Sequence, residues 1–149
     1  MTKTGTLQKP IFTSAKDVEA AFYDALARSD LDAMMAVWSE DEEVLCIHPG
    51  GPRVQGLAAV RESWRELFAG GPSLDVRVSQ GIVQNFMMVA VHSVLEFVTL
   101  EGDDQLGPPM IATNVYTRGP DGWRMVVHHA SPAPDERSLM IQDAPRTVH

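Results

Sequence analysis

Two ionisable side chains, His92 and Glu96, lie four residues apart in the run Met87–Leu100, whose residues alternate in character. Because alternate side chains of a β-strand point to one face, this spacing predicts that both residues share a face. A strand rises about 3.3 Å per residue, so the two are ~13 Å apart and each needs a partner from a neighbouring strand. A carboxylate in an apolar cavity has a raised pKa and can act as a general base, while a histidine or an amide can stabilise a developing oxyanion.

The next alternating run, Met110–Arg118, supplies further polar groups for the same face. Its even positions include Asn114 and Tyr116. Cross-strand neighbours on one face of a sheet lie close enough to interact. The pattern therefore predicts that Asn114 contributes to a polar site beside His92 and Glu96.

Two adjacent histidines, His128 and His129, lie near the end of a further run, Trp123–Ala130. Neighbouring residues of a strand point to opposite faces, so only one histidine can face a cavity. The parity of the run assigns His128 to the cavity face together with Val126, and assigns His129 to the outer face together with Met125. A β-bulge just before His128 would exchange the two histidines.

A second interpretation of Glu96 places it near the rim, paired with Arg118 or Arg124, because buried acids are rare unless they are paired. The sequence leaves both interpretations open. No His-x-His or His-x3-His spacing indicates three converging ligands, so we predict no metal site. The chemistry expected of such a site is proton transfer without a cofactor.

Aromatic side chains and one further histidine are candidates for the wall of the cavity. His48 comes just before the turn Pro49–Pro52, where a cavity mouth is expected, although a lone histidine there also suits a structural hydrogen bond. The aromatic residues suit a flat apolar ligand, and equally a core at helix and strand periodicity. The candidate catalytic residues are Glu96, His92 and His128, and the candidate ligand-binding residues are Trp38, His48, Trp64, Asn114 and Tyr116.

The elements that position these residues begin with helices. Ser14 followed by Asp17 resembles a capping box, and apolar residues then recur at helical spacing up to Leu26. A second, shorter helix is expected from the N-cap Asp30 through Trp38, and a third over Leu57–Phe68. The N-terminal half therefore predicts about three helices.

In the C-terminal half, the apolar residues recur with a period of two. Four runs are predicted to be strands of an antiparallel meander, with turns at Gly102–Asp104 and Gly119–Gly122. Helices followed by a sheet indicate an α+β fold. Because neither sheet face reads as fully exposed, we expect helices on one face and a partner subunit on the other. The four runs are Leu74–Val83, Met87–Leu100, Met110–Arg118 and Trp123–Ala130.

The composition argues against some classes of binding partner. The chain has 149 residues, 12 of them basic and 20 acidic, with a net charge of −8. The basic residues form no stripe, so binding to nucleic acid or to an anionic membrane is not expected. The single cysteine, Cys46, cannot form an internal disulfide, and no apolar run resembles a signal peptide or a membrane span. These features predict a cytoplasmic protein.

The run FYDALARSDLDAMMAVWSEDEEVLCIHPGGPRVQGLAAVRESWRELF, residues 22–68, resembles the nuclear transport factor 2-like superfamily, which includes the SnoaL-like and ketosteroid-isomerase-like proteins. The resemblance extends over about Ser14 to Pro132. It implies a cystatin-like cone, with about three N-terminal helices packed into a strongly bent antiparallel sheet. No acid and tyrosine can be matched residue by residue to the isomerase pattern, so the resemblance does not carry that activity over.

The run TNVYTRGPDGWRMVVHHASPAP, residues 113–134, is most similar to the association domain of calcium/calmodulin-dependent protein kinase II and its stand-alone bacterial relatives. The positions of that domain's three pocket arginines align with Val94, Asn114 and Ala130, so its carboxylate-binding character is not implied here. The matching residues are Thr113, Val115, Arg118, Asp121, Gly122, Trp123, Val126, His129 and Ser131.

The sequence thus predicts an N-terminal arm (1–13), a SnoaL-like domain (14–132) and a C-terminal tail (133–149), in which Leu139–Ile141 covers the cavity mouth or crosses to a neighbouring subunit. A homodimer through the outer sheet face is expected. Two functions remain open. One is binding of a small apolar or carbonyl-containing ligand, with cofactor-free isomerase or hydratase chemistry. The other is a non-catalytic oligomerisation or binding module, as the resemblance to the kinase association domain implies.

Overall fold

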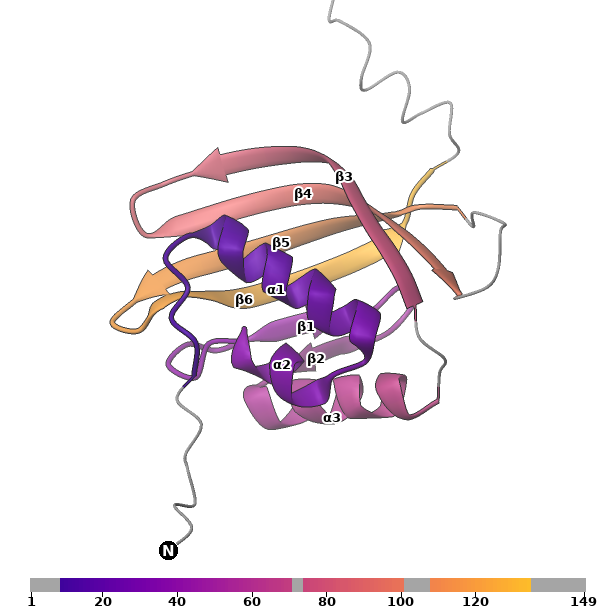
Figure 1. The fold of residues 1–149 in the computed structure, drawn as a ribbon, viewed down its shortest axis with the longest axis horizontal. Helices are drawn as coiled ribbons and strands as arrows, with labels where there is room; N and C mark the ends of the chain where they lie inside the picture. Colours follow the sequence, from indigo (N-terminus) through magenta and orange to yellow (C-terminus); the bar gives the residue numbers. More distant parts are fainter. Residues whose placement is uncertain (1–8, 71–73, 101–107, 135–149) are drawn as a thin grey trace, which may run out of the picture.

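Three helices lie against one face of a curved six-stranded sheet (Figure 1). The structure is a computed structural model that describes residues 9–70, 74–100 and 108–134. The predicted turn Gly102–Asp104 and the tail segment Leu139–Ile141 lie outside these ranges. Within them, no helix is both long enough and apolar enough to cross a bilayer.

The first helix, α1 (Ala15–Arg28), begins at the predicted cap. The hydroxyl oxygen of Ser14 accepts a hydrogen bond of 3.1 Å from the backbone N–H of Asp17, which satisfies a donor that the first turn leaves free. Ser29 ends the helix in the left-handed conformation at φ 51°. The side of α1 that packs on the sheet contains Val18, Phe22, Tyr23, Ala25 and Leu26, all of them buried.

The second helix, α2 (Leu31–Ala36), is capped by Asp30 as predicted but ends earlier than the pattern indicates. Trp38 was expected on its apolar stripe and instead forms an isolated β-bridge with Met125. The backbone N–H of Met125 donates to the carbonyl of Val37 at 2.8 Å. This pairing with the sheet draws the chain out of the helix, so the predicted helix end is wrong. The third helix, α3 (Leu57–Ala69), follows the prediction closely.

The four long strands form the predicted antiparallel meander. The sheet has the order β2-β1-β6-β5-β4-β3, so that β2 and β3 are its edges. Its strands are β1 (Leu45–Ile47), β2 (Arg53–Gln55), β3 (Leu74–Asn85), β4 (Val89–Leu100), β5 (Met110–Gly119) and β6 (Gly122–Pro132).

Two strand pairings, both made by β1, lie outside the prediction. The short strand β1 runs parallel to β6, and β2 folds back antiparallel to β1 across the predicted Pro49–Pro52 turn. The turn is closed by a 2.8 Å hydrogen bond from Gly51 N–H to the carbonyl of His48. A three-residue strand is too short to show a period of two, so β2 leaves no pattern in the sequence.

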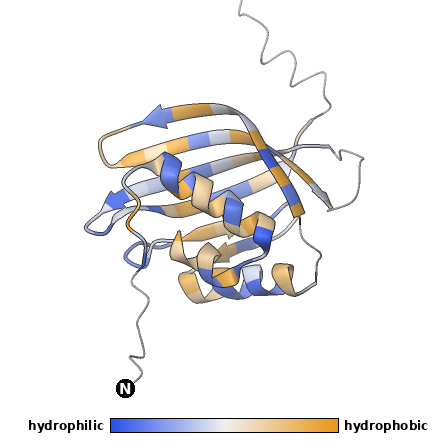
Figure 2. Cartoon of the chain, in the orientation of Figure 1, coloured by the Kyte–Doolittle hydropathy of each residue, from blue (hydrophilic) through white to orange (hydrophobic). Residues whose placement is uncertain are grey.

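A row of polar residues crosses the concave face of the sheet. His92 lies directly opposite Asn114, Asn114 opposite His128, and His128 opposite Cys46. All four side chains are buried, whereas His129 is exposed on the other face. The predicted parity of these strands is confirmed, and polar positions visibly interrupt the apolar ones along them (Figure 2).

A β-bulge in β6 corrects one detail of that parity. Val115 pairs with Val127 and Tyr116 pairs with Met125, which leaves Val126 as the extra residue. Met125 therefore shares the inner face with Tyr116 and His128, although the simple count places it outside. The bulge lies before His128, but it exchanges Met125 and Val126 and leaves His128 on the concave face.

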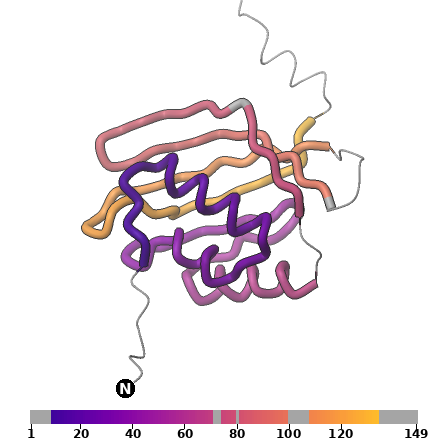
Figure 3. Tube along the Cα trace, viewed as in Figure 1, coloured from indigo at the N-terminus to yellow at the C-terminus, as the bar shows by residue number. Residues whose placement is uncertain are grey.

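The N-terminal segment is fixed to the β5–β6 hairpin, and the two lie side by side in the trace (Figure 3). Phe12 forms a parallel bridge with Gly122, and the N–H of Trp123 donates to the Phe12 carbonyl at 2.9 Å. Gly122 has φ +90°, and a Cβ at this position would lie 2.5 Å from that carbonyl oxygen. Only glycine suits this close approach.

Candidate functional site

A buried hydrogen bond joins α1 to β4 across 73 positions of the sequence. The Tyr23 hydroxyl donates a 2.6 Å hydrogen bond to Oε2 of Glu96. Glu96 is only 4% exposed. Burial raises the pKa of its carboxyl, and the hydrogen bond from Tyr23 partly offsets that rise. Burial and the neighbouring carboxylate also raise the pKa of Tyr23, so its hydroxyl remains a proton donor to Glu96.

Asn114 and His128 extend this contact into a chain. The side-chain amide Nδ2 of Asn114 donates to the Tyr23 hydroxyl at 2.9 Å. Its carbonyl Oδ1 lies 2.6 Å from Nδ1 of His128. Because a carbonyl oxygen only accepts, Nδ1 of His128 carries the proton and Nε2 does not. Donors thus point in one direction along the chain, toward Glu96.

His128 is neutral in this arrangement. Burial lowers the pKa of its imidazole to about 3, and the nearby His48 and His129 add to the effect. Its ring packs on Phe22, with the ring centroids 4.7 Å apart. A neutral, tightly packed imidazole with a fixed tautomer holds the amide of Asn114 in one orientation.

A second polar pair lies one helical turn earlier on α1. Nδ1 of His92 is hydrogen bonded to Oε2 of Glu19. His92 is 2% exposed and the Glu19 side chain 20% exposed, so the pair connects the interior to solvent. The imidazole ring also meets the ring of Tyr116 edge to face, with centroids 4.9 Å apart. The carboxylate holds the ring of His92 in one orientation, as a carboxylate–histidine pair does in enzymes.

His48 belongs to a separate polar contact on the α3 side. Its Nε2 lies 3.1 Å from the hydroxyl oxygen of Ser63, which in turn donates to the carbonyl of Val60 at 2.8 Å. The single proton of that hydroxyl is used, so Nε2 of His48 must be the donor to Ser63. Burial lowers the pKa of His48, and its ring stands edge to face on Trp64.

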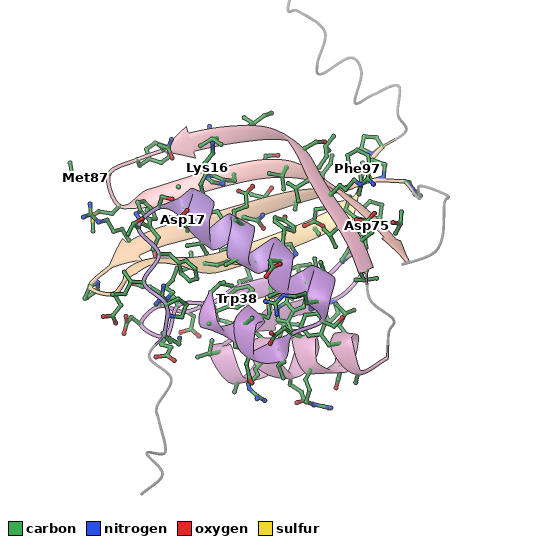
Figure 4. The ribbon with its side chains drawn as sticks, viewed as in Figure 1. Lys16, Asp17, Trp38, Asp75, Met87 and Phe97 are labelled. Carbon is green, nitrogen blue, oxygen red and sulfur yellow. The ribbon has the colours of Figure 1, made fainter. Side chains whose placement is uncertain are left out.

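The structure brings together seven of the eight predicted site residues, with Trp38 apart from them. His92, Glu96, Asn114, Tyr116 and His128 lie on the concave face, and Trp64 packs between His48 and His128. Trp38 is buried in the core on the segment that follows α2, where it bridges Met125 of β6 (Figure 4). Within the described ranges, three buried polar atoms have no hydrogen-bond partner: the indole nitrogens of Trp38 and Trp64 and the hydroxyl of Tyr116.

Two members of the site, Glu19 and Tyr23, were missed from the sequence. Both lie on α1, four residues apart, and so on one side of the helix. Tyr23 follows Phe22 within the apolar stripe, which made it resemble an ordinary core residue. A glutamate next to Val18 on the same stripe was the available signal, since acids seldom occupy a buried helix side unless they are paired.

The alternative interpretation of Glu96 as a rim residue is wrong. Glu96 faces the interior and meets Tyr23. Arg124 is held at the other end of the sheet, where its guanidinium donates to the carbonyls of Pro10 and Trp123 at 2.6 and 3.0 Å. It also lies 5.0 Å from the centroid of the Phe12 ring. Its contacts fix the N-terminal segment to β6.

A surface pocket of about 370 Å³ lies at that same end, between the N-terminal segment and the β5–β6 hairpin. Its wall includes Lys9, Glu40, Arg118 and Asp121, and none of the predicted site residues. Glu40 is paired with Lys9 at 2.8 Å. In the described part of the chain, no group of three or more His, Cys, Asp or Glu side chains is arranged to hold a metal ion.

Comparison with known proteins agrees with this architecture. Residues 15–136 match the family model of the SnoaL-like domain. A solved structure from Thiobacillus denitrificans, provisionally described as a calcium/calmodulin-dependent protein kinase type II association domain, is 38% identical with a TM-score of 0.78, covering 84% of this chain and 99% of that one. A protein of the NTF2-like family from Streptomyces avermitilis, provisionally described as a dehydratase, is 29% identical with a TM-score of 0.71, covering 79% and 92%.

A curated relative is the F-box protein SKIP8 of Arabidopsis thaliana, 26% identical over 132 residues, which are 89% of this chain and 52% of that protein. The chain thus spans about half the length of this relative. Two structures from Nostoc punctiforme described as having a cystatin-like fold also superimpose, with TM-scores of 0.66 and 0.68. With its helices packed into a curved sheet and its family match over residues 15–136, the chain belongs to the SnoaL-like family of NTF2-like proteins.

Proposed function

We propose that the interior of the cone binds a small carbonyl compound and transfers a proton on it without a cofactor, as an isomerase or a hydratase does. The observation that carries the proposal is the buried Glu96 carboxyl, whose pKa is raised and which is held by the Tyr23 hydroxyl. A carboxyl group with a raised pKa is suited to exchange protons near neutral pH. The 29% identity to a provisionally described dehydratase supports the same class of chemistry.

In the proposed reaction the Glu96 carboxylate takes a proton from the carbon next to the carbonyl. The electron pair of that C–H bond forms a carbon–carbon double bond, and the π pair of the carbonyl moves to its oxygen, which becomes an enolate oxygen. Return of a proton from the Glu96 carboxyl to a carbon of the enolate completes the transfer. Tyr23 and Asn114 are proposed to donate hydrogen bonds to the enolate oxygen, because the Tyr23 hydroxyl already donates to Glu96 and the Asn114 amide donates to that hydroxyl. A ligand that reaches Glu96 therefore replaces one hydrogen bond between these side chains with a hydrogen bond to itself.

The remaining candidate residues have different proposed roles. His92 is a proton donor or acceptor oriented by Glu19. His128 is a positioning residue that holds the amide of Asn114 in one orientation. The proposed wall of the binding site includes the two indole nitrogens and the Tyr116 hydroxyl, for which a polar atom of a ligand would supply a partner. This wall comprises Trp38, His48, Trp64 and Tyr116.

The test is exchange of the α-protons of cyclohexanone for deuterium in D2O, followed by proton NMR. The full chain is expected to accelerate the exchange, and Glu96→Gln to lower the rate by about 100-fold or more, as loss of a general base does. Glu62→Gln is the matched control, because Glu62 is exposed on α3 and paired with Arg65. An unaccelerated exchange, or a Glu96→Gln protein as active as the wild type, contradicts the proposal.

Self-association is a second candidate function, favoured by a specific surface. Five large apolar side chains near the β3–β4 turn are 43–85% exposed, and Met87 projects from the tip of the hairpin (Figure 4). They lie beside the free edge strand β3, and the 38% identical relative is described as an association domain. The proposed occupant is a second copy of this chain. The five residues are Ile82, Val83, Phe86, Met87 and Met88.

Size-exclusion chromatography with light scattering tests this second function. The wild type is expected to run as a dimer or larger assembly, and the double variant Phe86→Ser, Met87→Ser as a smaller species. Leu67→Ser, at an exposed apolar position on α3, serves as the control and should keep the wild-type mass. A wild type that is monomeric at micromolar concentration contradicts the assembly.

A further inference from the structure

The surface pocket beside the β5–β6 turn has no part in the proposed proton transfer. Its volume is about 370 Å³, within the range of ~300–1,000 Å³ that small-molecule sites occupy. Three segments form its wall: the N-terminal segment at Lys9 and Ile11, the loop 39–42 after α2, and the β5–β6 hairpin. We call it the hairpin pocket.

Arg124 places a buried positive charge on the hairpin side of this pocket. The residue is 8% exposed, and its guanidinium donates to the carbonyls of Pro10 and Trp123. In the part of the chain that the structure describes, it makes no ion pair with a carboxylate. A guanidinium has more N–H donors than these two contacts use, and its planar shape matches a carboxylate. The exposed Arg118 on β5 adds a second guanidinium to the same wall.

Carboxylates line the hairpin pocket from the loop after α2. Asp41 and Glu42 are both exposed there. Their backbone N–H groups donate to the hydroxyl oxygen of Ser39 at 3.2 and 3.1 Å. The N–H of Ser39 in turn donates to the carbonyl of Met125 at 2.9 Å. The loop is thus fixed to β6, which holds its carboxylates at the pocket.

Charges of both signs therefore meet in the hairpin pocket. Burial lowers the pKa of Arg124, and the nearby carboxylates of Asp121 and of the loop after α2 oppose that change. The carboxylates repel a simple anion, and the guanidinium groups repel a simple cation. A molecule that carries both an ammonium group and a carboxylate is attracted by both sets of side chains. Ile11, which is 73% exposed, adds an apolar contact to the wall.

We propose that the hairpin pocket binds a free amino acid with an apolar side chain. The carboxylate of the amino acid binds the guanidinium groups of Arg118 and Arg124. Its ammonium group binds the carboxylates of Asp41 and Glu42, and its side chain packs on Ile11. A pocket volume near the lower end of the usual range suits a molecule of this size. The site is independent of the proposed proton transfer, whose residues do not line it.

The test compares three probes by NMR titration of the full chain at about pH 6.5, at which α-amino groups are protonated. The probes are leucine, leucinamide, which has no carboxylate, and N-acetylleucine, which has no ammonium group. Leucine is expected to bind about tenfold more tightly than either derivative, because each derivative loses hydrogen bonds between charged groups. Leucine should also shift the amide signals of Gly119 and Gly122, which line the pocket. Equal affinities for the three probes, or no binding of leucine at millimolar concentration, contradict the proposal.

Two variants test which side chains hold each end of the amino acid. Arg118→Gln should weaken the binding of leucine about fivefold but not that of leucinamide, which has no carboxylate to lose. The double variant Asp41→Asn, Glu42→Gln should weaken the binding of leucine but not that of N-acetylleucine. Its backbone N–H groups can still donate to Ser39, so the loop keeps its position. A variant that weakens all three probes equally would overturn the assignment.

The matched controls change charges outside the hairpin pocket. Arg65→Gln removes an exposed guanidinium on α3, and the double variant Asp24→Asn, Glu62→Gln removes two exposed carboxylates. Both should bind leucine as the wild type does. Glu96→Gln should also bind leucine normally, even where it abolishes proton exchange on cyclohexanone. A Glu96→Gln protein that loses leucine binding would place the ligand in the interior and overturn the proposal.

Discussion

The hydroxyl of Tyr23 donates a 2.6 Å hydrogen bond to the carboxylate of Glu96, and this contact joins the first helix to strand β4. It connects residues 73 positions apart in the sequence. Because Glu96 is buried and ionisable, the same contact affects both the stability of the fold and the proton affinity of the proposed base. Its two effects can be measured separately.

Loss of the hydroxyl should change the stability of the protein differently at two buried tyrosines, Tyr23 and Tyr116. Tyr23→Phe removes two hydrogen bonds, one to the Glu96 carboxylate and one from the amide nitrogen of Asn114, so the free energy of unfolding should fall by about 1–3 kcal/mol. Tyr116→Phe removes a hydroxyl that has no partner within the described chain, so stability should stay within about 0.5 kcal/mol or rise. Urea unfolding of the two variants checks the contrast, and equal losses would contradict it.

The buried His128 makes stability depend on pH in the acid range. Its folded pKa is about 3, below the ordinary 6.5 expected after unfolding. As pH falls from 6.5 toward 3, the His128 imidazole binds a proton in the unfolded chain but stays neutral in the folded protein. The free energy of unfolding therefore decreases. His128→Gln should flatten this part of the profile, which urea unfolding at several pH values measures. An unchanged slope would show that His128 is protonated in the folded protein.

Cys46 should be inert in the folded protein. Burial raises the pKa of its thiol to about 12, and the thiolate is the reactive form. Since it is the only cysteine, labelling with iodoacetamide at pH 8 reports on it alone. Labelling should be at least about tenfold slower than in urea-unfolded protein. Equal rates in the two states would mean that β1 opens readily.

Gly122 should tolerate no side chain. A Cβ there would lie 2.5 Å from the Phe12 carbonyl oxygen, and φ is +90°. Gly122→Ala is therefore expected to cost about 1–3 kcal/mol and to loosen the N-terminal segment. Gly119→Ala in the same hairpin is the control, because nothing lies within 4 Å of its added Cβ. Hydrogen exchange of the Trp123 amide, which bonds Phe12, distinguishes the two variants, and similar protection in both would contradict the clash.

The site residues on the strands could be predicted to face inward, because the alternation of side chains along a strand is fixed by backbone geometry. The positions of His92, Glu96, Asn114 and His128 follow from counting by two along three strands, and the structure places all four inside. The count fails at Met125 and Val126, where a bulge adds one residue to β6. A bulge depends on the partner strand and leaves no signal in a single run.

The helix side of the site could not be predicted in the same way. Which side of α1 meets the sheet follows from its apolar stripe, but which strand lies under each residue depends on how the helix crosses the sheet. The contacts of Glu19 with His92 and of Tyr23 with Glu96 are therefore properties of tertiary packing. The short strand β2 and the parallel pairing of β1 with β6 could not be predicted from the sequence either, because they too depend on tertiary packing.

The measurement that tests the central claim most directly is a carbon-13 NMR titration of the Glu96 carboxyl, assigned by its loss in Glu96→Gln and repeated with cyclohexanone added. We expect the pKa of Glu96 to lie above that of ordinary glutamates because the carboxyl is buried. It should rise further in Tyr23→Phe, which removes a hydrogen bond to the charged form. Bound cyclohexanone should shift the Glu96 signal. A carboxyl that titrates together with the surface glutamates and ignores cyclohexanone would contradict a buried proton-transfer site in this fold.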